Sequence, residues 1–278
     1  MNKKQSILLQ NGLAYVSALI LCSFCVIPLL WAVSTSLKPL EMVYAMPPRW
    51  IPNPIDLSYY VNTFHNERMG AYFVNSAVIS SGATLIALII GMMAAYGLSR
   101  FKFRGRNLLL WSVLFTKLFP RVVIIVPLYL ILRNMHLLGT HIGLILSYMV
   151  VVLPIAIWLL KGFIDKIPVE MEEAAVMDGC TTFSLISRII IPMTFPAIAA
   201  VAMYSFVLAW NEFLFALIFS SPDTRPLAVG LAFFIDETGV RWGDLMASSI
   251  VMSIPVVVVF TLSQKLLIRG LSEGAVKG

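Results

Sequence analysis

The sequence predicts an all-α, polytopic integral membrane protein with six transmembrane helices and cytoplasmic N and C termini. Hydrophobic residues make up 59% of the 278 residues and charged residues 12%, whereas soluble domains carry about 45–50% and about 25%. The mean hydropathy of +0.89 excludes both a disordered chain and an ordinary soluble enzyme. The placing of the basic residues then gives the orientation.

Six stretches are long and apolar enough to span a bilayer, because about 20 residues rising about 1.5 Å each cross about 30 Å of hydrocarbon. They cover residues 12–36, 71–98, 107–132, 142–161, 192–219 and 245–267. No soluble domain fits between them. Residues 1–278 are therefore expected to form a single transmembrane domain.

Lysines and arginines gather in alternate connections between these stretches. The connection between the second and third stretches holds Arg100, Lys102, Arg104 and Arg106, and both termini and the connection between the fourth and fifth stretches are also basic. Membrane proteins retain such residues in the cytoplasm. These segments, and with them both termini, are predicted to be cytoplasmic.

Catalytic and metal-binding motifs are absent from the sequence. It has no G-x-x-x-x-G-K-[ST] phosphate loop, so the chain is expected not to bind ATP in that manner. It also has no H-E-x-x-H, no G-x-S-x-G and no metal-spaced cluster of cysteine and histidine. We therefore expect no catalytic residue, no metal site and no cofactor on this chain, and we expect it not to be an enzyme.

The most informative segment is the predicted cytoplasmic loop over residues 165–190. Pro168 suits the first turn of a helix, the glutamates that follow favour its positive end, and Gly179 stands where a left-handed turn would end it. Thr181 or Thr182 can cap a second helix that runs to Pro192. The loop is thus predicted to be a helix, a glycine turn and a helix.

Two interpretations of the first loop helix are open. A short amphipathic helix can lie on the bilayer with no further role, but such helices usually have a basic polar face. This one is acidic, which is unfavourable beside an anionic leaflet, and Ala174 and Ala175 would let another backbone approach closely. These features favour docking into a groove of another protein.

The loop also matches a known motif. Glu173-Ala174-Ala175, then Gly179, then Ile189-x-Ile191-Pro192 match the Glu-Ala-Ala-x-x-x-Gly-x(9)-Ile-x-Leu-Pro motif of bacterial ABC importer permeases, with Ile191 in place of Leu. Segments 94–101, 104–106, 127–129, 210–213 and 270–278 extend the likeness over nearly the whole chain. The chain resembles the second permease subunit of carbohydrate importers of the maltose-transporter type.

The resemblance implies a function and a set of partners. It implies a permease subunit of an ATP-driven importer that moves a sugar or oligosaccharide across the bacterial cytoplasmic (inner) membrane. The implied partners are a second, different permease, two ATPase subunits that hold ATP and Mg²⁺, an external solute-binding protein and membrane lipid. A nucleic acid partner is not implied.

The resemblance also assigns residues. Those implied in coupling to the ATPase are Glu172, Glu173, Ala174, Ala175, Asp178, Gly179, Ile189 and Pro192. Glu173 would pair with a basic group of the ATPase, and Ala174 and Ala175 would make the close contact. The tail residues Gly270, Gly274, Lys277 and Gly278 would contact the ATPase dimer; the alternative is a solvated, frayed terminus.

Two cations lie inside the third apolar stretch. Lys117 and Arg121 flank Pro120, and a spacing of four residues would place them on one helical face. A charge at mid-bilayer costs about 2.5–3.5 kcal/mol on insertion scales, so either both face a substrate pathway or both snorkel to an interface. Asn211 and Glu212 are further candidates for the pathway. Cations in the pathway would favour an acidic or phosphorylated sugar.

An ion-coupled secondary transporter or channel without an ATPase is the alternative function. Such proteins typically show inverted repeats or acidic residues within spans. Glu212 is the one acidic residue of this chain that qualifies. The sequence leaves open which sugar is carried.

Overall fold

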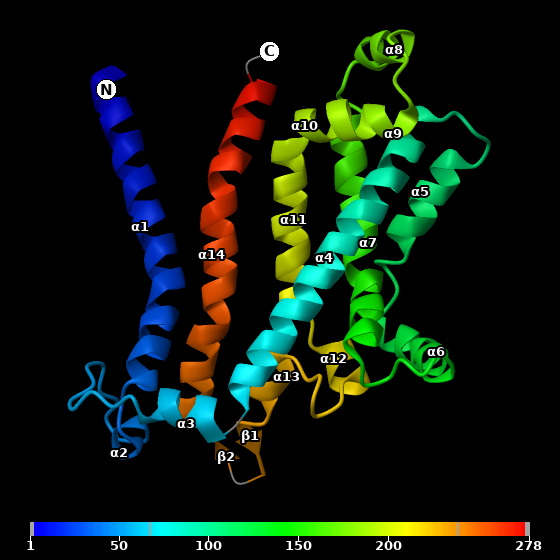
Figure 1. Ribbon diagram of the computed structural model, residues 1–278. Coiled ribbons are helices and arrows are strands. Elements are labelled where there is room, and N and C mark those ends of the chain that lie inside the picture. Colours follow the sequence, from blue (N-terminus) through cyan, green and yellow to red (C-terminus); the bar gives the residue numbers. More distant parts are fainter. Residues whose placement is uncertain (1–2, 67, 238, 276–278) are drawn as a thin grey trace. The chain divides into compact units, whose positions relative to one another are not determined.

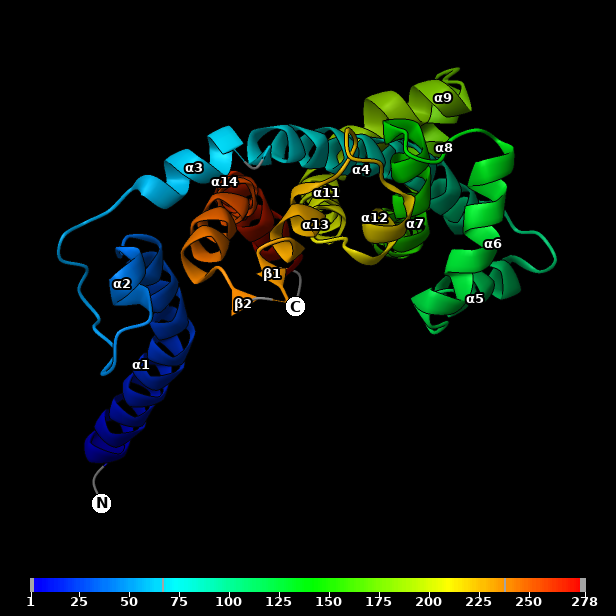
Figure 2. The ribbon, with the colours of Figure 1, turned by 90° about the horizontal axis from the view of Figure 1, so that it is seen from below.

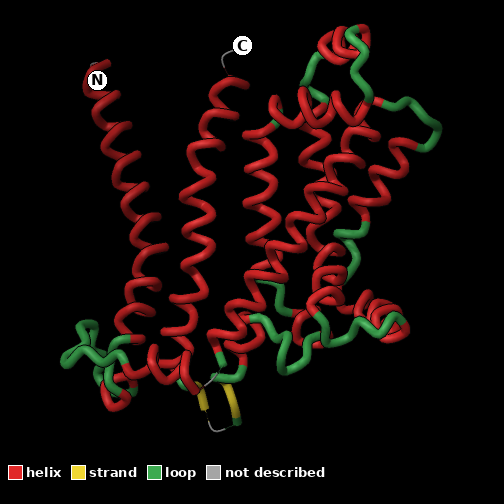
Figure 3. Tube along the Cα trace, in the orientation of Figure 1, coloured by secondary structure: helices red, strands yellow, loops and turns green. Residues whose placement is uncertain are grey.

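A computed structural model describes residues 3–66, 68–237 and 239–275, and most of this part of the chain is helical (Figure 3). The chain divides into two compact units. The first unit comprises Met1–Met69 and Leu231–Val251, and the second comprises Gly70–Gly230 and Met252–Gly278. The long helix α14 (Trp242–Ala275) contributes to both units.

The first unit is built on one long apolar helix. This helix is α1 (Lys3–Ser36). The further elements are α2 (Leu40–Val43), α3 (Ser58–Asn66), β1 (Ile235–Asp236), β2 (Gly239–Val240) and the start of α14. β1 and β2 are the only strands in the described part of the chain and pair antiparallel, with Ile235 opposite Val240 (Figure 3). The proline-rich segment after α2 folds back so that the Trp50 ring packs edge-on against Trp31, with centroids 4.8 Å apart.

The second unit holds most of the remaining helices (Figure 1). They are α4 (Met69–Arg100), α5 (Arg106–Phe115), α6 (Arg121–Asn134), α7 (His141–Ile164), α8 (Val169–Met177), α9 (Thr182–Leu185), the π-helix η1 (Ile186–Ile190), α10 (Ile191–Met193), α11 (Phe195–Trp210), α12 (Leu214–Phe219) and α13 (Leu227–Ala232).

Helix α7 lies at the centre of the second unit and packs against α5, α11 and α12 (Figure 2). It also approaches α4 closely, because a Cβ atom added at Gly91 would lie 3.4 Å from the Cβ of Ala156. Small residues at such contacts let helix backbones come together, which compensates for the weak hydrophobic drive between helices in lipid. The core is therefore rich in alanine, including Ala83, Ala87, Ala156 and Ala209.

Four described helices are long and apolar enough to cross a membrane, and a fifth span results if the bent pair Thr182–Met193 and Phe195–Trp210 counts as one. The four helices contain the predicted stretches at 12–36, 71–98 and 142–161 and most of that at 245–267. The count of six spans, the single domain and the cytoplasmic termini stay predictions.

The prediction of one continuous helix over 107–132 is wrong. Helix α5 ends at Phe115, and α6 begins at Arg121 after Pro120, whose backbone (φ −57°, ψ 125°) is extended. Proline has no N–H to donate to the preceding turn and disfavours helical geometry in the residue before it. Lys117 and Arg121 therefore do not share a helical face. The stretch 192–219 is divided as well, between α11 and α12.

Candidate functional site

The predicted coupling loop forms the helix, turn and second helix that the sequence indicates. Helix α8 follows Pro168 and ends at a turn in which Gly179 has φ +84°. The Gly179 amide donates to the Val176 carbonyl (2.9 Å), and the Cys180 amide donates to the Ala175 carbonyl (3.0 Å). This pair of bonds is the Schellman arrangement, which satisfies the last carbonyls of a helix. The left-handed glycine is confirmed.

The second helix of the loop starts where predicted and then changes direction. The Thr181 hydroxyl accepts from the Ser184 amide (3.3 Å) and caps α9. Helix α9 runs through the π-helix η1 into α10, and the axis then turns by 82° into α11. The Thr194 hydroxyl donates to the Ile190 carbonyl (2.6 Å) at this corner. The loop therefore continues directly into α11.

A buried ion pair ties α8 to the end of α4. Glu172 is 6% exposed, and its Oε1 atom lies 2.6 Å from the Nε atom of Arg100. The Tyr96 hydroxyl, one helical turn before Arg100, donates to Glu172 Oε2 (3.1 Å). A buried carboxylate is tolerated where it is paired and hydrogen-bonded, and both conditions are met here.

Arg100 also holds the end of α7. Its Nη2 atom donates to the carbonyl of Ile164 (2.9 Å), the last residue of α7, and to the carbonyl of Ile167 (3.0 Å), which lies between α7 and α8. The Ile164 carbonyl also accepts from the Ile167 amide (3.0 Å), so the guanidinium adds a second donor at the end of α7. One side chain joins α4, α7 and α8.

A second acidic residue reinforces this junction. Asp165 accepts from the Ser99 hydroxyl (2.6 Å) and from the Lys161 ammonium (2.6 Å). Partial burial alone would raise the pKa of Asp165, but the hydrogen bonds from Lys161 and Ser99 and the charges of Lys161 and Arg106 bring the pKa below its usual value. Asp165 is thus held in its ionised form.

The structure divides the predicted coupling residues into an exposed and an inward-facing group. Glu173, Ala174, Asp178, Gly179 and Pro192 are exposed. Ile189 is half-buried.

Two of the predicted coupling residues of α8 face into this chain. Ala175, expected at the contact with the ATPase, is 7% exposed and packs in the core of this chain. Glu172 is likewise turned inward, toward Arg100. Positions 172 and 175 lie one helical turn apart, so both point to the same inner face. Glu173 and Ala174 remain on the outer face of α8.

A second group of polar residues lies where α6, α7 and the break between α11 and α12 meet. The Nη1 atom of Arg121 lies 2.9 Å from Oε2 of Glu212; the Arg121 side chain is 52% exposed and that of Glu212 is 1% exposed. The other oxygen of Glu212 accepts from the Phe215 amide (3.1 Å) and so caps α12. The structure brings these two pathway candidates together.

The other two pathway candidates have different contacts. The Lys117 ammonium donates to the Val151 carbonyl of α7, three residues before Pro154, which interrupts the hydrogen bonds of that helix. The Asn211 amide donates back to Val207 in its own helix (2.8 Å). Sequence reasoning missed Tyr148, whose hydroxyl donates to the Glu212 carbonyl (3.2 Å).

The predicted tail contact is the least described. Gly270 and Gly274 lie within the bounds of α14, whereas Lys277 and Gly278 lie outside the described residues. Among the residues that the structure describes, histidine, cysteine, aspartate and glutamate form no group able to hold a metal ion.

The geometry of the loop and its motif agree with a family match. Residues 87–273 match the family described as the inner membrane component of binding-protein-dependent transport systems. The chain belongs to this family. Members are transporter subunits and not enzymes, and the matched region includes both the coupling loop and the Arg121–Glu212 pair.

Curated relatives match over nearly their full length. A permease protein of the diacetylchitobiose uptake system of Streptomyces coelicolor is 30% identical over 95% of this chain and 96% of its own. An inner membrane ABC transporter permease of Escherichia coli is 36% identical over 88% of each chain. A trehalose/maltose transport permease of Thermococcus litoralis is 31% identical over 97% of this chain and 98% of its own.

Two solved structures share the fold. A bacterial ABC transporter involved in the import of the acidic polysaccharide alginate aligns with a TM-score of 0.78 at 23% identity, over 95% of this chain and 98% of its own. A bacterial alginate ABC transporter in complex with an alginate pentasaccharide-bound periplasmic protein aligns with a TM-score of 0.69 at 14% identity, over 95% and 96%. The fold is thus that of ABC importer permeases.

Proposed function

We propose that this chain is one of two different permease subunits of an ATP-driven importer that brings a sugar or oligosaccharide into the cytoplasm across the bacterial cytoplasmic membrane. The names of the relatives support this, since they include uptake systems for diacetylchitobiose and for trehalose and maltose. The single observation that carries the mechanism is the coupling loop, in which α8 presents an acidic outer face while Arg100 ties its inner face to α4 and α7.

The partners follow from this proposal. Two ATPase subunits hold ATP and Mg²⁺, and the outer face of α8, with Glu173 and Ala174, docks in a groove of one of them. An external solute-binding protein delivers the sugar; a structural neighbour carries a periplasmic protein of this kind. In this arrangement ATP-driven movement of α8 reaches α4 and α7 through Arg100, and reaches α11 through the continuous α9–α10 segment.

The charge balance of the inner polar group favours a neutral sugar. Arg121 is compensated by Glu212, and Lys117 is engaged by a backbone carbonyl. Arg121 therefore does not present an uncompensated charge to an anionic substrate, and Lys117 keeps its charge but is directed at the Val151 carbonyl of α7. We propose that Arg121, which is half-exposed, contacts hydroxyl groups of the sugar while Glu212 holds it in place.

Copurification and reconstitution test the proposal. A tagged chain should bring down a second permease and an ATPase, and vesicles holding this complex should take up a labelled disaccharide only with ATP and the binding protein. The purified chain alone should hydrolyse no ATP, because it lacks a phosphate loop. Uptake driven by an ion gradient without an ATPase would overturn the proposal in favour of a secondary transporter. Calorimetry with the binding protein then identifies the sugar.

A further inference from the structure

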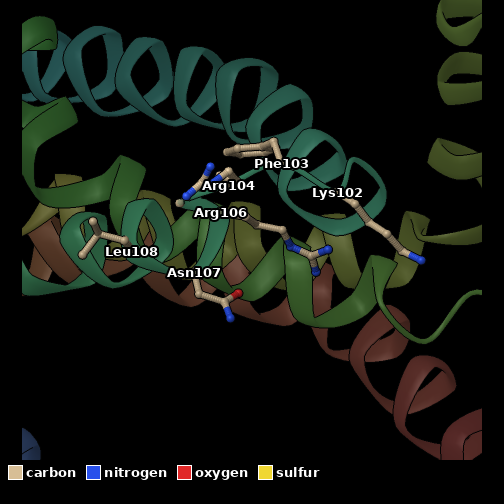
Figure 4. A pocket seen from close by; sticks show the side chains of 7 residues that line it. Lys102, Phe103, Arg104, Arg106, Asn107 and Leu108 are labelled. Carbon is tan, nitrogen blue, oxygen red and sulfur yellow. The ribbon is translucent and has the colours of Figure 1, made fainter.

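The connection between α4 and α5 forms an open basic pocket, and two of its cations, Lys102 and Arg106, also line a neighbouring pocket with residues of α8. The pocket has a volume of about 660 Å³ and is lined by seven consecutive residues, 102–108 (Figure 4). Three of them, Lys102, Arg104 and Arg106, are cations. Gly105 has φ +89°, a conformation open to glycine, and it reverses the chain so that the arginines on both sides of it line the same pocket.

These three cations are only partly compensated within the described part of the chain, where the charge of Arg106 acts on Asp165. None of them forms an ion pair or a side-chain hydrogen bond with another described residue, and the Nε atom of Arg106 is buried without a partner. Of the nearby carboxylates, Glu172 binds Arg100 and Asp165 binds Lys161, while Glu173 lines a neighbouring pocket with Lys102 and Arg106. Lys102 and Arg104 are exposed, so this connection carries an excess of positive charge that an anion can compensate.

The pocket also has an apolar side. Phe103 and Leu108 line it and are exposed, and Trp111, one turn further along α5, is exposed as well. The pocket follows directly on the membrane-spanning helix α4 and stands at the first turn of α5, whose amide groups favour negative charge. An occupant that is anionic at one end and apolar at the other satisfies all of these features.

We propose that this pocket binds the phosphate headgroup of an anionic phospholipid, with the acyl chains along the exposed face of α5. Basic clusters on the cytoplasmic side of a transmembrane helix attract anionic lipid in this way. Zwitterionic lipid carries the same phosphate but no net charge, so it leaves the cations only partly compensated. The proposal concerns lipid and does not depend on which sugar is carried.

Native mass spectrometry of the full-length chain, purified with its copurifying subunits, tests the proposal. The protein is titrated with phosphatidylglycerol and, separately, with phosphatidylcholine. The test variant is Lys102→Gln/Arg104→Gln. The matched control, Lys166→Gln/Arg133→Gln, removes one exposed lysine and one exposed arginine outside the pocket.

We expect phosphatidylglycerol to bind more tightly than phosphatidylcholine. The test variant should weaken phosphatidylglycerol binding by about 25-fold, that is by about fivefold for each cation. The control should bind like the unmodified chain, and Lys102→Arg/Arg104→Lys, which keeps both charges, should retain binding. This charge-keeping variant distinguishes loss of charge from loss of folding.

Three results would overturn the proposal. The first is equal affinity for the two lipids. The second is an equal loss in the test and control variants, or in the charge-keeping variant. The third is that inorganic phosphate displaces phosphatidylglycerol and binds the pocket with the same affinity. This result would assign the pocket to a free anion.

Discussion

The guanidinium of Arg100 and the carboxylate of Glu172 meet at 2.6 Å, although 72 residues separate them in the sequence. Their side chains are 12% and 8% exposed. Because Arg100 also binds the end of α7, this pair fixes the position of α8 relative to α4 and α7. Two adjacent glutamates thus have different roles: Glu172 anchors α8 from inside, and Glu173 faces outward.

Loss of Arg100 should uncouple the transporter. Arg100→Gln leaves Glu172 buried without its partner, a change that costs about 3–5 kcal/mol at buried pairs. We expect a lower unfolding temperature of the purified complex and loss of ATP-driven uptake. Adding Glu172→Gln should restore part of the stability, since both members are then neutral. Stability changes that simply add in the double variant would show that the two residues do not interact.

Substitution of Glu173 gives the opposite pattern. Glu173→Gln changes an exposed residue and should leave the unfolding temperature unchanged, because exposed charges contribute about 0–1 kcal/mol. It should nevertheless weaken ATPase association, measured by copurification, if the outer face of α8 is the docking face. Normal association together with normal uptake would remove Glu173 from the contact.

Gly179 allows a matched pair of substitutions. An added Cβ would meet no atom within 4 Å, so any effect comes from the left-handed backbone alone. Gly179→Val forces a β-branched residue to φ +84°, which costs about 1–2 kcal/mol, whereas Gly179→Asn is tolerated there. Both variants should accumulate in the membrane, but only Gly179→Val should lose ATPase association and uptake. Full uptake by the valine variant would contradict the coupling role of the loop.

The Arg121–Glu212 pair calls for a double substitution. Arg121→Leu strands a carboxylate that is 1% exposed, and because Arg121 itself is 52% exposed we expect a loss of stability below that at Arg100. Glu212→Gln in the same chain should recover the stability, while uptake stays low if Arg121 contacts the sugar. Recovery of both stability and uptake would restrict Arg121 to a structural role.

Asp165 should make the junction acid-sensitive. The pKa of Asp165 is lower in the folded protein than in the unfolded chain, where it is about 3.9. The hydrogen bonds of the Asp165 carboxylate therefore contribute fully to stability above the unfolded pKa, and this contribution is lost as the pH falls through the lower folded pKa. Asp165→Asn should reduce stability at neutral pH by about 0.5–1 kcal/mol, the range of partly exposed pairs. Once the pH is below the folded pKa of Asp165, the variant and the unmodified chain should unfold at similar temperatures. A constant difference at all pH values would refute the assignment.

Local chemistry explains which parts of the site the sequence predicts. Gly179 and Thr181 act on residues two to five positions away, so a turn and a cap follow from residue type alone. Arg100 and Glu172 come into contact only when α4 and α7 are packed, and the sequence of neither segment identifies the partner residue. The sequence does contain one signal for the inward orientation of Glu172, because Glu172 shares a helical face with Ala175.

Hydropathy alone also misjudged the region around Pro120. Residues 107–132 are apolar enough for one span, but a hydropathy average does not register the backbone break that a proline makes between Thr116 and Arg121. The cations on either side then find partners on α7 and beyond α11 instead of a common helical face. A proline flanked by two charges is the signal that would have divided this stretch.

The corner at Thr194 has a mechanical consequence. The two arms on either side of it meet at 82°, so a displacement along the first arm is nearly perpendicular to the axis of α11. Such a push tilts α11 sideways and hardly slides it along its own length. We therefore expect a movement of α8 that is passed along α9 and α10 to reach α11 as a change of its tilt.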